Sequence, residues 1–168
     1  MSETNYKQLL NHVKAFIFDV DGVLTDGMLH ISEQGELLRQ MNVKDGYALK
    51  HALNKDYKIC IISGGNNPAV KLRLEGLGIK NVYLGIDQKM ECLNEFSDEH
   101  NIPFENMCYM GDDIPDLPVM KVVGLATCPQ NAVPEVKAIS NYISHRNGGD
   151  ACVRDIIEQV LKTQHNWL

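Results

Sequence analysis

Two aspartates separated by one residue, Asp19 and Asp21, follow directly on a short apolar run. The run, residues 15–18, is too short for a helix and suits a buried parallel strand. A carboxylate at the end of a buried strand is costly unless a cation or hydrogen-bond donors meet it. Two neighbouring acids can divide their roles: one, held ionised by a divalent cation, attacks as a nucleophile, and the other donates and then accepts a proton.

The same residues admit structural interpretations. An Asp-x-Asp-Gly stretch opens an EF-hand calcium loop, but here no third oxygen ligand follows Gly22 and no glutamate closes the loop. A helix-capping aspartate is the other alternative. The catalytic interpretation therefore depends on partners further along the chain.

Two candidate partners are a hydroxyl and an amine. Ser63 and Gly64 end a second apolar run, and a hydroxyl beside free backbone N–H groups suits a phosphate oxygen. Lys89 opens a predicted helix, where a cation is mildly unfavourable against the helix dipole. We expect it to serve an anion such as a phosphate or the nucleophilic carboxylate. A common Ser-Gly-Gly turn and a solvated surface lysine are the alternatives.

A second cluster of carboxylates, Asp112, Asp113 and Asp116, follows a third apolar run. Mg²⁺ prefers oxygen ligands and often binds one or two carboxylates together with a substrate phosphate. Asp19 and Asp112 on neighbouring strands would supply that pair. Alternatively, Asp113 and Asp116 cap the next helix.

The elements that must position these groups alternate along the chain. Strands are predicted at 15–18, 57–62, 81–84, 107–110, 123–126 and 142–144, and helices at 6–13, 45–54 with Asp45 as its cap, 67–77, 89–100, 114–122, 134–138 and 151–163. A β-hairpin insert is expected at about 28–41. The pattern predicts one α/β domain over 1–168, a three-layer Rossmann-like parallel sheet, whose ligands bind beyond the carboxyl ends of the strands.

The composition of the chain indicates which classes of partner to expect. The 168 residues carry a net charge of -6 and contain no basic run, so we expect no nucleic-acid partner. We expect no membrane association, because no apolar run approaches the roughly 20 residues of a bilayer span. The polar segment 1–14 is unlike a signal peptide. Five scattered cysteines, never in a CxxC pair, favour a reducing, cytoplasmic compartment.

The order Asp-x-Asp-Gly, Ser-Gly, Lys and Gly-Asp-Asp resembles the haloacid dehalogenase-like phosphatases, over residues 16–116. The resemblance implies that Asp19 is the nucleophile and Asp21 the general acid and base. It implies that Ser63, Gly64 and Lys89 bind the transferring phosphoryl group. Mg²⁺ would be held by Asp19, the Asp21 carbonyl and Asp112. The implied reaction is phosphomonoester hydrolysis through an aspartyl-phosphate.

Specificity in this superfamily usually comes from a cap domain, and the spacing here leaves no room for one. The chain resembles a capless branch, the 3-deoxy-D-manno-octulosonate 8-phosphate phosphatases, through segments 19–27, 42–47 and 111–120. This resemblance implies a phosphorylated sugar acid as substrate and a homotetramer in which a tail, about 146–168, reaches a neighbouring active site. The implied substrate pocket is Asn42, Val43, Lys44, Asp45, Gly46, Lys50 and Arg73, besides Asp21, Ser63, Gly64 and Lys89.

The chain departs from its relatives at Gly65, where many carry arginine, and at Asp150, where the relatives tend to be glycine-rich and neutral. Arg73, Arg146 and Arg154 are all candidates for holding the substrate carboxylate by a bidentate fork. Nine-carbon sugar-acid 9-phosphates are the alternative substrates. A phospho-receiver and a non-catalytic assembly module are the rival functions, although a receiver needs no acid at position 21.

Overall fold

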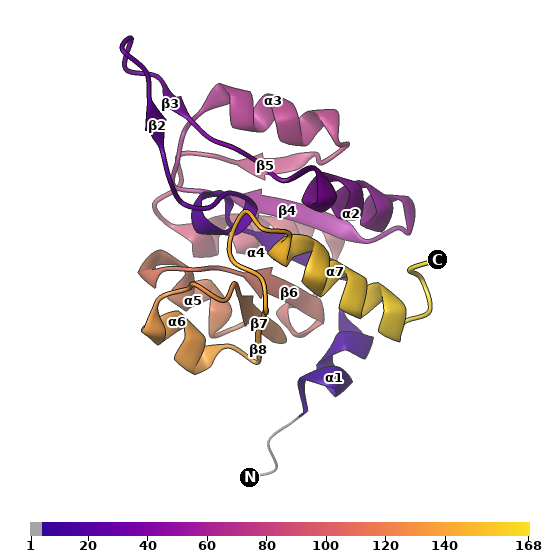
Figure 1. Ribbon diagram of the computed structural model, residues 1–168. Coiled ribbons are helices and arrows are strands. Elements are labelled where there is room, and N and C mark those ends of the chain that lie inside the picture. The colour runs from indigo at the N-terminus through magenta and orange to yellow at the C-terminus, as the bar shows by residue number, and fades with distance from the viewer. Residues whose placement is uncertain (1–4) are drawn as a thin grey trace.

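A computed structural model describes residues 5–168, so the first four residues of the polar N-terminal segment lie outside the described part. Six parallel strands form one sheet in the order β5-β4-β1-β6-β7-β8 (Figure 1). Their bounds are Ala15–Phe18 for β1, Lys58–Ile62 for β4, Asn81–Tyr83 for β5, Met107–Met110 for β6, Leu125–Cys128 for β7 and Tyr142–Ile143 for β8. The predicted α/β class with a parallel sheet is confirmed.

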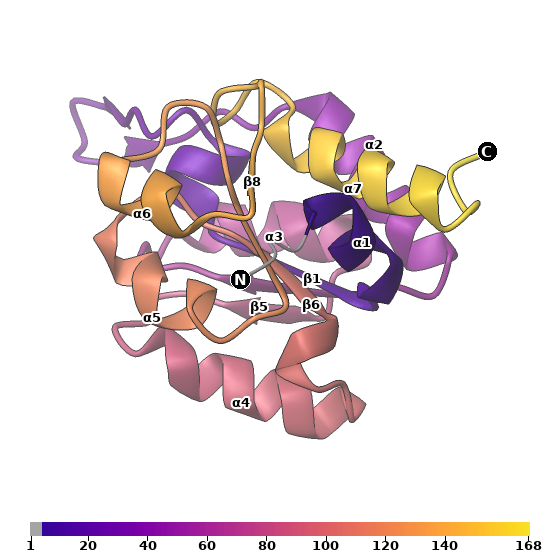
Figure 2. The same cartoon turned by 90° about the horizontal axis from the view of Figure 1, so that it is seen from below.

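Helices cover both faces of the sheet, which makes three layers (Figure 2). In β1, Phe16 and Phe18 face one core cluster, and Ala15 and Ile17 face the other, as the two-residue repeat of a strand requires. The first cluster lies under α1 (Tyr6–Leu9), η1 (Leu10–His12), α2 (Val43–Asn54), α3 (Pro68–Gly76) and α7 (Cys152–Thr163). The second lies under α4 (Lys89–His100), α5 (Leu117–Met120) and α6 (Pro134–Ile139). All four residues of β1 are buried, because the strand lies between two layers of helices.

The sheet register fixes where chemistry can occur. Phe18, the last residue of β1, pairs with Ile61 of β4 and with Met110 of β6. The segments that follow these three strands therefore leave the sheet at one edge, the edge at which ligands bind in such folds.

Several predicted boundaries differ from the structure. The strand predicted at 123–126 lies two residues later, at Leu125–Cys128, because Gly124 packs tightly on the backbone of Glu105 and donates its N–H to Phe104. The helix predicted at 114–122 is divided into η4 (Ile114–Asp116) and α5. The second helix begins at Val43 rather than at residue 45.

The insert is a two-stranded hairpin, β2 (His30–Ile31) and β3 (Leu37–Leu38), in which His30 lies opposite Leu38. It projects beyond the layers (Figure 1), and several of its apolar side chains are exposed, with Ile31 at 68%. The Asn67 side-chain amide donates to the Leu37 carbonyl at 2.9 Å, which attaches β3 to the start of α3. This hairpin stands where a cap domain would be inserted, and no separate cap is seen in residues 5–168.

The C-terminal residues fold back on the chain itself. Trp167 is 7% exposed, and its ring lies edge-on to Tyr47 and His51 of α2. Its carbonyl oxygen is 2.6 Å from His51 Nε2, and the Arg154 guanidinium lies over the Tyr47 and Trp167 rings. Among the helices of residues 5–168, none combines the length and apolar character that crossing a membrane requires.

Candidate active site

A cavity of about 410 Å³ opens at the carboxyl edge of the sheet. It is lined by the residues expected to act on a phosphoryl group, namely Asp19, Asp21, Ser63, Gly64, Lys89 and Asp112. They come from four places along the chain: the ends of β1, β4 and β6, and the start of α4. The structure therefore brings this predicted set together.

Asp19 stands at the end of β1 with both carboxylate oxygens engaged. Oδ1 accepts a hydrogen bond from the Val20 N–H at 2.6 Å, and Oδ2 lies 2.9 Å from Lys89 Nζ. Burial, together with repulsion from Asp116, raises the pKa of Asp19 to about 6 although Lys89 opposes the shift. A nearby cation stabilises a carboxylate that is buried and repelled by a second carboxylate.

Lys89 is buried, not a solvated surface residue, with 5% of its surface exposed. Its Nζ lies 2.8 Å from Asp116 Oδ1 as well as next to Asp19. Burial acts to lower the pKa of Lys89, but attraction by the two carboxylates outweighs it and the pKa is raised. Lys89 is therefore a fixed cation at the floor of the cavity.

Asp116, which the sequence analysis did not assign to the site, accepts hydrogen bonds from four surrounding groups. It is fully buried, and its Oδ1 accepts from Lys89 and, at 2.5 Å, from the Tyr109 hydroxyl. Its Oδ2 accepts from the backbone N–H groups of Asp112 at 2.9 Å and Asp113 at 3.2 Å. The capping role weighed for Asp113 and Asp116 is also present, as a reciprocal capping box on η4. Two of the four bonds to Asp116 brace the loop after β6 from within, and the other two attach it to Lys89 of α4 and Tyr109 of β6.

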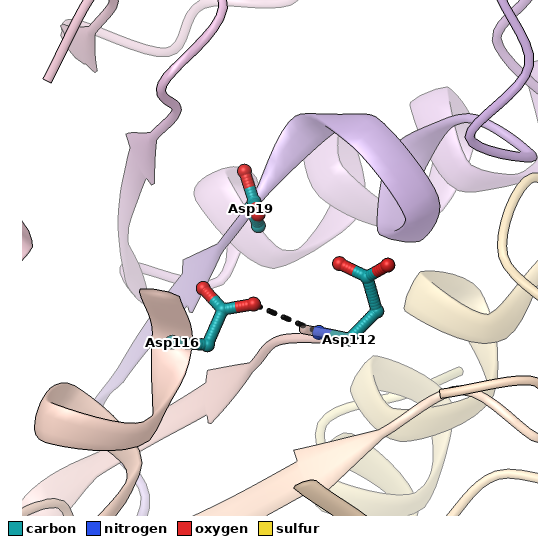
Figure 3. A group of neighbouring side chains, drawn as sticks. All are labelled: Asp19, Asp112 and Asp116. Atoms are coloured by element: carbon teal, nitrogen blue, oxygen red, sulfur yellow. Dashed lines mark hydrogen bonds between the residues drawn. The ribbon is translucent and has the colours of Figure 1, made fainter. Parts of the chain in front are cut away.

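Asp112 completes a cluster of three carboxylates. One oxygen from each of Asp19, Asp112 and Asp116 lies within 4.8 Å of the others, and the three side chains converge (Figure 3). Burial and repulsion by Asp116 and Asp19 raise the pKa of Asp112 to about 7. Gly22, at φ 85°, leaves the space that the Asp112 carboxylate fills, since a Cβ there would overlap it.

The donor set fits a hard divalent cation. Asp116 already accepts four hydrogen bonds, so Asp19 and Asp112 are the carboxylates left for a metal. Two carboxylates with room for water and a substrate phosphate are typical of Mg²⁺. The predicted third ligand, the Asp21 carbonyl, stays a prediction.

Asp21 lies at the mouth of the cavity beside a residue that sequence reasoning missed. Arg39 Nε is 2.6 Å from Asp21 Oδ1, and Arg39 Nη2 is 3.1 Å from Oδ2. Arg39 follows the hairpin strand β3, 18 residues away in sequence. An arginine in an exposed hairpin gives no sequence signal of this contact.

The turn after β4 forms the opposite wall. Ser63 is 2% exposed, and its Oγ accepts from the Gly65 N–H at 3.2 Å. A Cβ at Gly65 would lie 3.0 Å from both Arg39 Nη2 and Asp21 Oδ2, so the glycine leaves room for the arginine of the hairpin.

The loop before α7 closes on the loop after β1. The Gly149 N–H donates to the Val23 carbonyl at 3.0 Å. A Cβ at Gly148 would overlap the Gly22 carbonyl oxygen, so the two backbones touch directly. The glycines of the tail are therefore explained by packing within one chain.

Comparisons with known proteins agree with this geometry. Residues 85–156 match a family model described as haloacid dehalogenase-like hydrolase. The 3-deoxy-D-manno-octulosonate 8-phosphate phosphatase KdsC of Salmonella typhi is 35% identical over 153 residues, which cover 91% of this chain and 81% of that protein. The chain belongs to the haloacid dehalogenase-like hydrolases.

Solved structures extend the likeness to the whole fold. The 3-deoxy-D-manno-octulosonate 8-phosphate phosphatase from Yersinia pestis superposes with a TM-score of 0.95 at 31% identity, covering 98% of this chain and 89% of that one. The enzyme of the same name from Moraxella catarrhalis, in complex with magnesium ion, phosphate ion and a KDO molecule, gives 0.93 at 32% identity, covering 98% and 95%.

In this haloacid dehalogenase-like hydrolase, the remaining predicted pocket residues lie apart from the catalytic cavity. None of the seven, Asn42, Val43, Lys44, Asp45, Gly46, Lys50 and Arg73, is among the described residues that line it. Arg73 lies over Gly46 and lines a separate cavity of about 310 Å³ that Arg39 also borders. Val43, Lys44 and Lys50 are exposed on α2. Their contact with substrate stays a prediction.

Asn42 and Asp45 have structural duties in this hydrolase. Asn42 caps α2 by accepting from the Lys44 N–H at 2.9 Å, so the prediction that Asp45 caps this helix is wrong. Asp45 lies inside α2, 1% exposed, and accepts from the Arg154 N–H of α7 at 2.7 Å. It thus caps α7 from another helix.

The Asp45→Asn variant is expected to change how stability depends on pH. Burial raises the pKa of Asp45 from 3.8 to about 6, and Oδ2 has no hydrogen-bond partner within residues 5–168. Between pH 4 and pH 6 the folded state binds more protons than the unfolded state, so this group's contribution to the free energy of unfolding falls as pH rises through that window. A shift of about two pKa units corresponds to about 3 kcal/mol.

Urea unfolding of wild type and Asp45→Asn at pH 4.5 and pH 7.5 measures this contribution. Asparagine resembles the neutral acid, so the variant should gain stability relative to wild type at the higher pH by about 1–3 kcal/mol. Asp98→Asn on the exposed face of α4 is the control for loss of a charge. A difference between wild type and Asp45→Asn that is the same at both pH values would contradict the assignment.

Proposed function

We propose that the protein is a Mg²⁺-dependent phosphomonoesterase that releases phosphate from 3-deoxy-D-manno-octulosonate 8-phosphate, a step in making this lipopolysaccharide sugar. The observation that carries the proposal is one cavity lined by Asp19, Asp21, Lys89 and Asp112, in which Asp19 pairs with Lys89 and lies close to Asp112. The names of the Salmonella and Moraxella relatives supply the substrate class.

In the first step, an Asp19 carboxylate oxygen attacks phosphorus in line, and the bond from phosphorus to the sugar oxygen breaks. Asp21 gives its proton to the departing alkoxide. Lys89, the Ser63 hydroxyl and the loop N–H groups hold the equatorial phosphoryl oxygens, where charge must be stabilised. Asp19, Asp112 and the Asp21 carbonyl would hold Mg²⁺, which would neutralise charge on the phosphate.

In the second step, Asp21 accepts a proton from the water that attacks the aspartyl-phosphate. The bond between Asp19 and phosphorus breaks, inorganic phosphate leaves, and the Asp19 carboxylate is restored. The return of the proton to Asp21 makes the enzyme ready for the next substrate. A second acid two residues after the nucleophile is what distinguishes this cycle from a phospho-receiver, which stops after phosphorylation.

We also propose one domain over 1–168, a homotetramer and a cytoplasmic location. Exposed apolar side chains on the hairpin, among them Met28, Ile31 and Leu38, support contacts between subunits. Five buried cysteines with free thiols support a reducing compartment. The reach of the tail into another site has no support in the position of Trp167, which docks on the same chain.

Steady-state kinetics with Mg²⁺ on a panel of phosphomonoesters tests the function. The expected result is the highest kcat/KM for the eight-carbon 8-phosphate, well above that for a nine-carbon sugar-acid 9-phosphate and for p-nitrophenyl phosphate. A preference for the nine-carbon substrate would overturn the substrate assignment. A stable phosphoprotein without phosphate release would instead indicate a receiver, and no reaction with any phosphomonoester would indicate an assembly module.

A further inference from the structure

We propose that Arg39, carried by the inserted hairpin, is the positioning residue for Asp21. This inference rests on the proposed function, because it concerns the acid and base of that reaction. Arg39 acts through Asp21 and is not itself a catalytic residue.

The contact between the two side chains fixes an orientation. Arg39 presents Nε and Nη2 to the two oxygens of Asp21, at 2.6 and 3.1 Å. A planar guanidinium paired with both oxygens defines the plane of the carboxylate, which a single-point contact does not. Within the described residues, Arg39 is the one side chain that is hydrogen bonded to the Asp21 carboxylate.

Asp21 needs such a partner because its own surroundings hold it loosely. It lies in the turn after β1, and its side chain is 36% exposed at the mouth of the cavity. Asp19, by contrast, is held by Lys89 and the Val20 N–H. A half-exposed carboxyl group without Arg39 would sample several rotamers. Misplacement of a reacting group by about 1 Å can cost about 100-fold in rate.

Arg39 is itself well anchored. Its side chain is only 8% exposed, and Nη1 donates to the Leu37 carbonyl at 3.1 Å. The same carbonyl accepts from Asn67 Nδ2, at the start of α3. The hairpin is therefore attached to the start of α3 at Leu37, two residues before the arginine.

Gly65 makes the arrangement possible. A Cβ at this position would lie 3.0 Å from Arg39 Nη2 and 3.0 Å from Asp21 Oδ2. Contacts this short would force one of the two groups to move. The turn after β4 and the hairpin are thus fitted to each other, so Gly65→Ala disturbs the ion pair without removing either charge.

The choice of leaving group separates positioning of Asp21 from other roles of Arg39. The sugar-acid 8-phosphate releases an alkoxide that needs a proton, whereas p-nitrophenyl phosphate releases a stable anion that departs without one. Loss of Asp21 positioning should therefore slow phosphorylation of the enzyme by the sugar phosphate and spare phosphorylation by the aryl phosphate. Hydrolysis of the aspartyl-phosphate needs Asp21 with both substrates and should slow in both.

Rapid-mixing experiments on wild type, Arg39→Gln, Arg39→Lys and Gly65→Ala provide the test, with Lys71→Gln on exposed α3 as the control. For Arg39→Gln we expect a p-nitrophenolate burst within about 3-fold of the wild-type rate, and steady-state turnover and sugar-phosphate cleavage reduced by about 100-fold. Arg39→Lys should recover part of the loss, and Gly65→Ala should show the same pattern more weakly. Because only hydrolysis of the aspartyl-phosphate slows with p-nitrophenyl phosphate, kcat and KM for this substrate should fall together and kcat/KM should stay near the wild-type value.

Equal losses in the phosphorylation step for both substrates, or a raised KM with an unchanged sugar-phosphate cleavage rate, would overturn the inference. Wild-type turnover in Arg39→Gln would do the same. Melting temperatures identify a variant that fails to fold, and if Arg39→Gln fails, Gly65→Ala and Arg39→Lys decide the outcome. A wild-type enzyme that releases phosphate from neither substrate would count against the proposed function instead.

Discussion

Replacing Asp19 with asparagine is expected to reduce phosphate release by about 10,000-fold or more, the scale on which enzymes that lose a covalent nucleophile fall. An amide oxygen is a poor nucleophile, and the variant also loses a negative charge from the proposed metal site. Phosphate release in single-turnover experiments measures the loss, and acid-quenched protein reports whether a phosphoenzyme forms. We expect neither product nor phosphoenzyme.

Asparagine has nearly the shape of aspartate, so the fold should survive the exchange. The Asp19→Asn amide oxygen can still accept from Val20 N–H, while the contact with Lys89 loses its charge. A melting temperature near that of wild type would show that lost turnover is chemical in origin. Substantial turnover by a folded Asp19→Asn protein would remove the nucleophilic role from this residue.

The Asp116→Asn variant is expected to lose both stability and activity. Asp116 is fully buried, and it is one of the two carboxylates that neutralise the buried Lys89 ammonium. Removing one partner from a buried ion pair costs about 3–5 kcal/mol. Because the same side chain orients the Asp112 N–H and Lys89, we also expect kcat to fall by about 100-fold or more, as for misplaced catalytic groups.

Urea unfolding and steady-state kinetics measure these two effects. The matched control for stability is Asp113→Asn in the same loop, where asparagine caps η4 about as well as aspartate and the expected change is below about 1 kcal/mol. If Asp116→Asn unfolded at the same urea concentration as Asp113→Asn and wild type, the stabilising role given to Asp116 would be wrong.

The catalytic edge could be predicted because its signals are local. An apolar run that ends in carboxylates, as at Asp19 and Asp112, gives both the strand and the chemistry of its end. The bounds of β1, α4 and β6 agree with the predicted segments for this reason. Because the strands are parallel, their carboxyl ends lie at the same edge of the sheet, and no other contact has to be predicted.

The residue roles that could not be predicted from the sequence depend on contacts between segments far apart in the chain. In the sequence, Asp45 has the position of an N-cap for its own helix. Only the packing of α7 against α2 shows that Asp45 instead accepts from the Arg154 N–H of α7. The pairing of Arg39 with Asp21 requires knowing where the hairpin lies. Asp116 was weighed as a local cap, and its bonds to Lys89 and Tyr109 arise only when α4 packs beside β6.

The direct backbone contact between Gly22 and Gly148 has a consequence for recombination and for protein engineering. A side chain at Gly148 would overlap the Gly22 carbonyl oxygen, so each loop must match the path of the other. A chimera that took residues 19–27 from one homologue and residues 146–152 from another would join backbones shaped for different partners. The two segments are therefore best inherited, grafted or redesigned as a pair, although more than half of the chain separates them.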